Sequence, residues 1–219
     1  MNQFNHCSKD SSLAKGSCSG HLCIVNNDIE YLKQRTMNIA AEQTFSVPAR
    51  AEVSATNQAI FDKLQKGLGF VPNLYAYFAK NETALGDYLT LQNRKSSLRA
   101  KEREVINLVT SQINGCRYCQ SAHTVLGKMH GFSDEQILEI RSGSATFDSK
   151  LDALASFTAS VVANRGRATL AAKEAFFAAG YTESHMIDVV IVIGDKIISN
   201  YLHNLTGFEI DFPLADEIV

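Results

Sequence analysis

Apolar residues recur every three or four positions through most of the chain after residue 54, and glycine, proline and capping residues interrupt the pattern. This spacing predicts a series of amphipathic helices. We expect them at residues 54–66, 73–80, 82–94, 101–113, 118–130, 133–142, 148–164, 168–179 and from 182 past 198. No stretch alternates with period two as a half-buried strand does. The sequence therefore predicts an all-α fold, a bundle of seven to nine helices.

The last of these helices begins near Thr182 and is the most apolar. The segment from Met186 to Ile198 also carries Asp188, Asp195 and Lys196, so a buried helix fits it better than a membrane span. Its large aliphatic side chains are expected to be deeply buried. They are Ile187, Val190, Ile191, Ile197 and Ile198.

The tail from Phe208 to Pro213 has apolar residues at alternate positions, which predicts an extended segment. On a helical protein, such a tail packs either across its own surface or onto a neighbouring subunit. The sequence leaves both arrangements open.

The beginning of the chain lacks the helical pattern. Residues 1–36 are rich in serine, asparagine, lysine and glycine, and they hold three of the five cysteines and two of the six histidines. Such a cluster could bind zinc or form disulfides, but the missing periodicity favours a disordered leader. We therefore expect a leader over residues 1–46, with Met37 as a candidate start of translation, and a helical domain over residues 47–219. The cluster consists of His6, Cys7, Cys18, His21 and Cys23.

Composition and charge narrow the choice of partners. With 45% hydrophobic and 20% charged residues, the chain has the composition of a globular protein. Its net charge of -2 gives no reason to expect nucleic acid or an anionic membrane as a partner. No secretory signal pattern is present, so we expect a cytoplasmic, reducing location. Paired cysteines in such a compartment more often serve redox or metal chemistry than a structural disulfide.

One pair of cysteines lies close to a histidine. Cys116 and Cys119 follow an Asn-Gly break, and His123 comes four residues later. At ~100° per residue, His123 projects within roughly 20° of Cys116 and about 40° of Cys119, so all three share one helix face. Cys116 lies at the first turn, where free N–H groups and the helix dipole favour a thiolate. The segment thus supplies a nucleophile, a second thiol able to close a disulfide, and a base.

Other interpretations of this segment stay open on spacing alone. Zinc needs four ligands, or three and a water, and no fourth ligand lies at the usual spacing. Covalent haem attachment needs the histidine directly after the second cysteine, which is not the case here. The remaining alternative is two small buried thiols beside a histidine that only packs. Redox chemistry is the favoured interpretation of the three.

The segment from Glu104 to Cys119, with His123 after it, resembles the core of the alkylhydroperoxidase AhpD and carboxymuconolactone decarboxylase family. The shared pattern is a glutamate twelve residues before the first cysteine, a Ser-x-x-Asn-Gly approach, a CxxC motif and then the histidine. The resemblance covers about Val47 to Pro213. It extends to the stretches at residues 71–74, 101–104 and 200–207.

This resemblance implies an AhpD-like helical bundle that forms homo-oligomers, often trimers or hexamers. It also implies a thiol-dependent peroxidase acting on hydrogen peroxide or organic hydroperoxides, with no metal or other cofactor. In the family picture Cys119 attacks the peroxide and becomes a sulfenic acid. Cys116 then resolves it to a disulfide, while Glu104 and His123 relay protons. A dithiol partner, either a lipoyl protein or a thioredoxin-like protein, would restore the thiols.

At three positions, the reasoning from the residues and the family pattern lead to different expectations. The helix-terminus argument makes Cys116 the more acidic thiol, whereas the family assigns the attack to Cys119. One AhpD subgroup has a histidine where this chain has Tyr118, so activity here is expected to be weaker or differently coupled. Helical periodicity places Glu102 nearer the middle of the apolar face than Glu104, which the family spacing selects.

Two further functions remain as alternatives. A decarboxylase acting on a lactone of aromatic catabolism would share the fold, but its chemistry needs no redox dithiol, so the intact CxxC motif argues against it. A non-enzymatic redox sensor or metal-binding module could also be built on the same fold. Metal analysis and a titration of free thiols would separate these alternatives.

Overall fold

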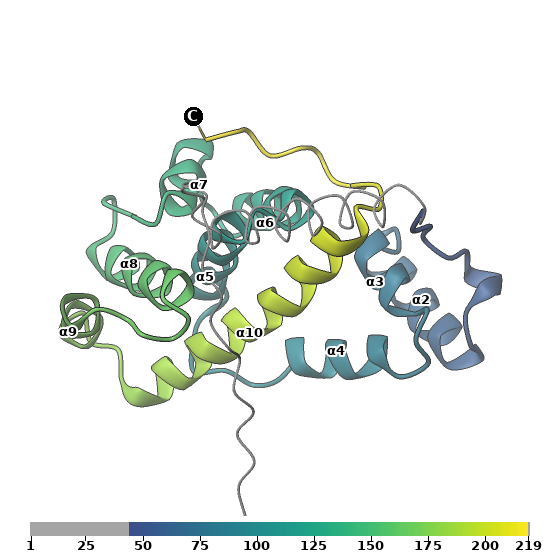
Figure 1. The fold of residues 1–219 in the computed structure, drawn as a ribbon, viewed down its shortest axis with the longest axis horizontal. Coiled ribbons are helices and arrows are strands. Elements are labelled where there is room, and N and C mark those ends of the chain that lie inside the picture. Colours follow the sequence, from purple (N-terminus) through teal and green to yellow (C-terminus); the bar gives the residue numbers. More distant parts are fainter. Residues whose placement is uncertain (1–43, 219) are drawn as a thin grey trace, which may run out of the picture. The chain divides into compact units, whose positions relative to one another are not determined.

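The structure is a computed structural model that describes residues 44–218. Within that range it contains one short 3-10 helix, η1 (Arg50–Glu52), nine α-helices and no strand. The all-α prediction is therefore confirmed, at the upper end of the expected number of helices (Figure 1). The helices are α2 (Ala55–Leu68), α3 (Asn73–Phe78), α4 (Ala84–Gln92), α5 (Ala100–Ile113), α6 (Arg117–Met129), α7 (Asp134–Arg141), α8 (Ser149–Ala163), α9 (Leu170–Ala178) and α10 (Glu183–Thr206). The predicted leader with its cysteine cluster, and the candidate start at Met37, lie outside the described residues up to position 43.

Local capping residues set the helix ends close to where the sequence predicts them. The Ser54 hydroxyl accepts a hydrogen bond from the Asn57 N–H at the start of α2, and Gly69 ends that helix in the left-handed conformation (φ 84°). The Ser133 side chain and Gln136 form the predicted capping box of α7. These ends depend on residues within one turn of each other, so sequence alone locates them.

Helix α5 lies at the centre of the main core and packs against α6, α7, α8 and α10. Its side chains Val105, Ile106, Leu108 and Val109 are fully buried. Burying an aliphatic side chain of this size contributes about 1.5–3 kcal/mol relative to leaving it exposed. The core thus fixes α5 rigidly beside α6 and α10, the two helices that frame the cysteine segment (Figure 1).

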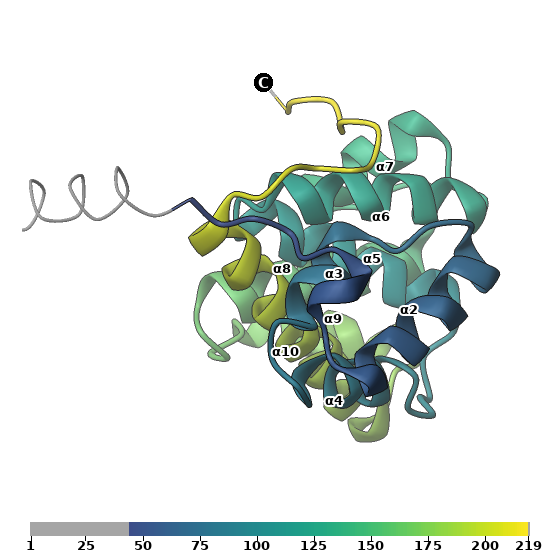
Figure 2. The ribbon, with the colours of Figure 1, turned by 90° about the vertical axis from the view of Figure 1, so that its right-hand side faces the viewer.

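The C-terminal tail packs across its own chain, which is the first of the two predicted arrangements. It runs from the end of α10 along α6 (Figure 2), and Phe208 is buried against the cysteine segment. The Tyr118 hydroxyl donates to one oxygen of Asp211 at 2.7 Å, and the other oxygen accepts the Asn73 N–H at 2.7 Å. One tail carboxylate therefore links α6 to the start of α3.

The expected deep burial of the aliphatic residues of α10 is wrong. Ile187, Val190 and Ile198 are 58%, 53% and 44% exposed, and Ile191 and Ile197 are half-buried. The opposite face, with Asp188, Asp195 and Lys196, is buried instead. Polar partners on α4, α6 and the loop after α4 satisfy those three charges; Ser96 and Ser97, for example, donate to Asp188. Within residues 44–218, α10 included, no helix is long and apolar enough to cross a membrane.

Candidate active site

The cysteine segment forms the junction between α5 and α6. Gly115 has φ 64°, a conformation that glycine adopts without the penalty of a side chain, and Cys116 follows as the N-cap of α6. The Cys116 sulfur accepts the Cys119 N–H at 3.4 Å, so the two residues face each other across the first turn. Both are buried free thiols. In the part of the chain that the structure describes, no group of three or more His, Cys, Asp and Glu side chains is placed to hold a metal ion.

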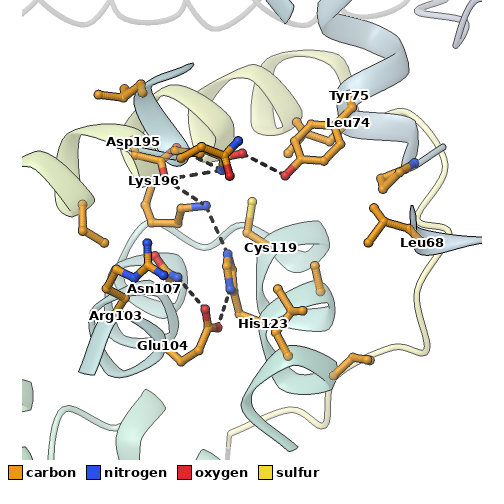
Figure 3. Close-up of a pocket in the computed structure, with 18 of the residues that line it drawn as sticks. Leu68, Leu74, Tyr75, Arg103, Glu104, Asn107, Cys119, His123, Asp195 and Lys196 are labelled. Atoms are coloured by element: carbon orange, nitrogen blue, oxygen red, sulfur yellow. Dashed lines mark hydrogen bonds and ion pairs between the residues drawn. The ribbon is translucent and has the colours of Figure 1, made fainter. Parts of the chain in front are cut away.

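A cavity of about 580 Å³ opens beside α6. Cys119 and His123 both line it, whereas Cys116, the third residue predicted on that face, lies behind the wall and is fully buried. Aliphatic and aromatic side chains such as Leu74 and Phe212 make most of the remaining lining. Figure 3 shows the Cys119 sulfur and the His123 ring directed into this space.

A chain of polar contacts runs along one side of the cavity (Figure 3). The carboxylate of Glu104 contacts Nδ1 of His123 at 2.8 Å and accepts the Asn107 amide at 3.0 Å. The Lys196 ammonium contacts Nε2 of His123 at 3.1 Å. Because an ammonium group can only donate, Nε2 is the acceptor and the ring proton lies on Nδ1, where Glu104 accepts it. Glu104 and Lys196 thereby fix both the orientation and the tautomer of His123.

Lys196 is 3% exposed and holds a positive charge inside the protein. Burial acts to lower its pKa, but Tyr88, Asp195 and Cys119 raise it, and the net shift is upward. The Asp195 carboxylate lies 3.6 Å from the ammonium and accepts the Gln92 amide at 3.3 Å. Helix α10 thus places the Lys196 ammonium, with its charge balanced by Asp195, in the cavity wall that faces α6.

The electrostatic environment separates the two thiols. A hydrogen bond from Cys116 lowers the pKa of Cys119; burial opposes this, and the positive charge of Lys196 lowers the pKa further. The pKa of Cys116 is raised, first because its proton is held by Cys119 and then by burial. These effects on the two pKa values outweigh the helix-terminus effect that favoured a thiolate at Cys116. The field of Lys196, which comes from α10, favours a thiolate at Cys119.

The first test is the pH dependence of thiol alkylation. A lowered pKa makes the thiol a thiolate at lower pH, so iodoacetamide labelling of Cys119 should reach its plateau below about pH 8.5, the ordinary midpoint of a free cysteine. Brief labelling across a pH series, followed by peptide mass spectrometry, measures this. Cys116 is the internal control and should label slowly throughout. A Cys119 rate that still climbs above about pH 9 would contradict the assignment.

The two acidic residues of α5 have different partners. Glu102 is slightly more buried than Glu104, at 3% against 7% exposed, as periodicity predicts. However, Glu102 accepts the Arg99 N–H at 2.8 Å and the Tyr181 hydroxyl at 3.2 Å, away from the cavity. Glu104 is the one that contacts His123. Helical periodicity ranks Glu102 as the more buried of the two. The family spacing selects Glu104, which is the one beside His123.

Sequence reasoning missed the part of the site that comes from outside α5 and α6. Lys196, Asp195 and Gln92 extend the polar chain, and Asn107 holds the free oxygen of Glu104. One signal was available. Asp195 and Lys196 are adjacent opposite charges in the middle of the most apolar helix, and a charged pair at such a position is seldom buried without a partner. On the sequence alone, that pair spoke only against a membrane span.

Comparison with known proteins agrees with this fold. The carboxymuconolactone decarboxylase family model matches residues 78–179, a segment that includes Glu104, both cysteines and His123 but stops before Lys196. No curated protein matches the chain in sequence. Its helical fold is AhpD-like, and the segment that carries the site resembles the carboxymuconolactone decarboxylase family.

Several solved structures share the fold. One is a peroxidase-related protein with an alkylhydroperoxidase AhpD core from Ralstonia eutropha JMP134, which is 21% identical to this chain and superposes with a TM-score of 0.69. The match covers 76% of this chain and 91% of the Ralstonia chain. A peroxidase-related protein from Silicibacter sp. TM1040 is 24% identical with a TM-score of 0.67, covering 76% and 90%. A variant of the debrominase Bmp8 in complex with 2,3,4-tribromopyrrole is 15% identical with a TM-score of 0.64, covering 78% and 93%. At these identities the likeness is one of fold.

Proposed function

We propose that this protein is a thiol-dependent, peroxidase-like oxidoreductase that reduces organic hydroperoxides or hydrogen peroxide through Cys119 and Cys116. The observation that carries the proposal is the position of the Cys119 sulfur. It lies in the cavity wall beside the chain formed by Glu104, His123 and Lys196, and Cys116 lies one helical turn behind it. The match of residues 78–179 to the family model supports the coarser statement that the protein is an enzyme of peroxidase-related or decarboxylase type.

The first step is attack of the Cys119 thiolate on the hydroperoxide. A sulfur–oxygen bond forms, the oxygen–oxygen bond breaks, and the alkoxide or hydroxide that leaves takes up a proton to become an alcohol or water. Lys196 is suited to stabilise the negative charge on the leaving oxygen, because its ammonium lies in a largely apolar cavity where such an interaction is strong. His123, oriented by Glu104, borders the same space and can pass a proton.

The second step closes the disulfide. Cys116 attacks the sulfenic acid on Cys119, a sulfur–sulfur bond forms, and the sulfur–oxygen bond breaks to release water with the proton of Cys116. An external dithiol then supplies two electrons and two protons and leaves as its own disulfide. The cycle reduces one hydroperoxide to an alcohol and a water for each dithiol oxidised.

The burial of the thiols bears on the nature of the reductant. Cys116 and Cys119 are 0% and 2% exposed, so the reducing thiol must enter through the cavity. A lipoyl group on a flexible arm can reach such a site, whereas a thioredoxin-like protein would have to present its thiol at the surface. Of the two expected partners, the lipoyl protein therefore fits better.

The size of the cavity bears on the substrate. A volume of about 580 Å³ is within the range of about 300–1,000 Å³ typical of sites for organic ligands and far exceeds what hydrogen peroxide occupies. Its aliphatic and aromatic lining favours an apolar organic hydroperoxide over hydrogen peroxide.

Counting free thiols before and after peroxide tests the proposed function. One equivalent of cumene hydroperoxide should remove two thiols per chain, and peptide mass spectrometry should locate the loss at Cys116 and Cys119 rather than at the cysteines before residue 44. Added dihydrolipoamide should restore both thiols and give repeated turnover. Retention of both thiols in excess peroxide would exclude the proposal.

Decarboxylation is the second candidate, because the matching family model carries that description. The observation in its favour is the Lys196 ammonium in an apolar cavity, which could hold the carboxylate of an acidic lactone. That chemistry needs neither thiol. A chain with both Cys116→Ser and Cys119→Ser would then retain full activity on the lactone, an outcome that separates the two functions.

A further inference from the structure

Arg103 is a charged residue of the cavity beside α6 that is not used by the chemistry described so far. It lies on α5, directly before Glu104, and is half-buried in the cavity lining. Within residues 44–218 its guanidinium forms no ion pair and donates no hydrogen bond, whereas the other four charged residues of the lining each have a polar partner. Those four are Arg94, Glu104, Asp195 and Lys196. Because an arginine stays protonated in proteins, this part of the cavity carries an uncompensated positive charge.

Arg103 is remote from the reacting sulfur. Glu104 contacts His123 at 2.8 Å, and His123 follows Cys119 by four residues, which cover about 6 Å of helix. Since α5 and α6 run in opposite directions from a tight turn, Arg103 lies beyond His123 as seen from Cys119. Figure 3 shows Arg103 on one side of the contact between Lys196 and His123, and the Cys119 sulfur on the other. A group held by Arg103 is therefore a part of the ligand that does not react.

The other end of the cavity is apolar and opens to solvent. The rings of Phe70 and Phe212 pack edge to face there, with their centroids 5.6 Å apart. Leu68 and Phe70 are 54% and 36% exposed, so the rim of this end is apolar as well. In Figure 3, Leu68 lies on the side of Cys119 away from Arg103. The cavity thus has a cation at one end, an apolar surface at the other, and the reactive thiol between them.

We propose that Arg103 binds a carboxylate of the substrate, and that the substrate is the hydroperoxide of a long-chain carboxylic acid. Its peroxide group lies within the chain, at Cys119, and the hydrocarbon beyond the peroxide occupies the apolar end. The inference rests on the proposed peroxidase function and names the substrate class of that site. The bonds that form and break at Cys119 are those already given for an organic hydroperoxide.

The chemistry of Arg103 favours a carboxylate over other groups. A guanidinium offers two parallel N–H donors that match the two oxygens of a carboxylate. One uncompensated positive charge balances one carboxylate, whereas a phosphate ester brings about −1.5 to −2 charges at neutral pH. A neutral hydroperoxide would leave the charge of Arg103 unbalanced in a cavity lined largely by apolar side chains.

Binding at both ends would also orient the substrate. A chain held by its carboxylate at Arg103 and by its hydrocarbon at the apolar end has its middle part placed against the Cys119 sulfur. Such positioning favours the approach of the thiolate to the peroxide oxygen. Hydrogen bonds to a charged group change affinity by roughly 10- to 100-fold, so the acid should bind at least about tenfold more tightly than its uncharged ester.

Steady-state kinetics with a matched pair of substrates tests the proposal in the full-length chain. The hydroperoxides of linoleic acid and of methyl linoleate share the chain and the peroxide and differ in the carboxylate. With dihydrolipoamide as the reductant, KM for the acid should be at least about tenfold below KM for the ester. In the Arg103→Gln protein the two KM values should become about equal. The loss should fall on KM rather than on kcat, because the carboxylate is bound equally in the ground and transition states.

Arg167→Gln is the matched control. It removes the same charge from an exposed arginine outside the cavity lining, so the preference for the acid should stay as it is in the native chain. Arg103→Lys keeps the charge but loses the paired donors, and it should retain part of the preference. Equal KM values for acid and ester in the native chain, or an unchanged preference in the Arg103→Gln protein, would overturn the proposal.

Protection of Cys119 from alkylation separates a failure of this inference from a failure of the peroxidase function. Linoleate, which carries no peroxide, should slow iodoacetamide labelling of Cys119 in the native chain. Methyl linoleate should need about tenfold higher concentrations or more, and the Arg103→Gln protein should lose this difference. If neither hydroperoxide is turned over while linoleate still protects preferentially, the carboxylate site stands and the peroxidase function fails. Equal protection by linoleate and its ester would overturn the carboxylate site, whatever the turnover.

Discussion

Cys119→Ser should abolish peroxide consumption, and Cys116→Ser should allow one turnover and then stop. The serine hydroxyl at position 119 is too weakly acidic to attack a peroxide, whereas Cys119 has a lowered pKa and lines the cavity. Without Cys116, residues 44–218 offer no second thiol that could form a disulfide with the sulfenic acid on Cys119. Peroxide loss with added dihydrolipoamide measures turnover, and a dimedone adduct identified by mass spectrometry measures the trapped sulfenic acid.

The two substitutions control for each other, because each replaces one buried thiol of the same turn by a hydroxyl. Continued cycling of the Cys116→Ser protein would show that Cys116 does not resolve the intermediate. A dimedone adduct on Cys116 in the Cys119→Ser protein, with peroxide consumed, would reverse the proposed order of attack.

Lys196→Met should lower the reactivity of Cys119 at neutral pH by about tenfold or more. Without the ammonium, the pKa of Cys119 moves up toward the ordinary value, at which only a few per cent of a thiol is ionised at about pH 7. The alkylation profile of Cys119 should shift to higher pH. The substitution also leaves Asp195 buried without its cation, and breaking a buried pair in this way costs about 3–5 kcal/mol of folding stability.

Lys150→Met is the matched control for this experiment. Lys150 lies 3.9 Å from the buried Glu102, so the same substitution removes a cation beside a different buried carboxylate. Because Lys150 is far more exposed than Lys196, its loss should leave both the Cys119 profile and the melting temperature nearly unchanged. An unchanged Cys119 profile in a folded Lys196→Met protein would remove Lys196 from the mechanism.

The features that could be predicted depend on residues near each other in sequence. The turn that places Cys119 and His123 on one face is a local property of a helix, and so are the caps at Ser54 and Ser133. The partnership of His123 with Glu104 spans two helices. It could be anticipated only from the resemblance to a family.

The face of α10 that is buried could not be predicted in the same way. The helix has aliphatic residues around much of its circumference, so periodicity does not distinguish the core from a second apolar surface. The buried face is the one with Lys196 and Asp195, because these two residues form polar contacts with His123 and Gln92. Since those partners lie about 70 and 100 residues away, helical periodicity gives no information about them. The same cation adds to the hydrogen bond from Cys116, which is the main cause that makes Cys119 the more acidic of the two thiols.

Tyr118, between the two cysteines, makes the catalytic segment dependent on the tail. Its hydroxyl accepts the Leu74 N–H at 3.1 Å and donates to Asp211, while Phe212 forms part of the cavity wall. A chain cut after Thr206 would therefore lack one wall of the cavity and the carboxylate that holds Tyr118, and Cys119 should become more accessible to solvent. Docking of residues 208–212 thus completes the cavity wall beside Cys119.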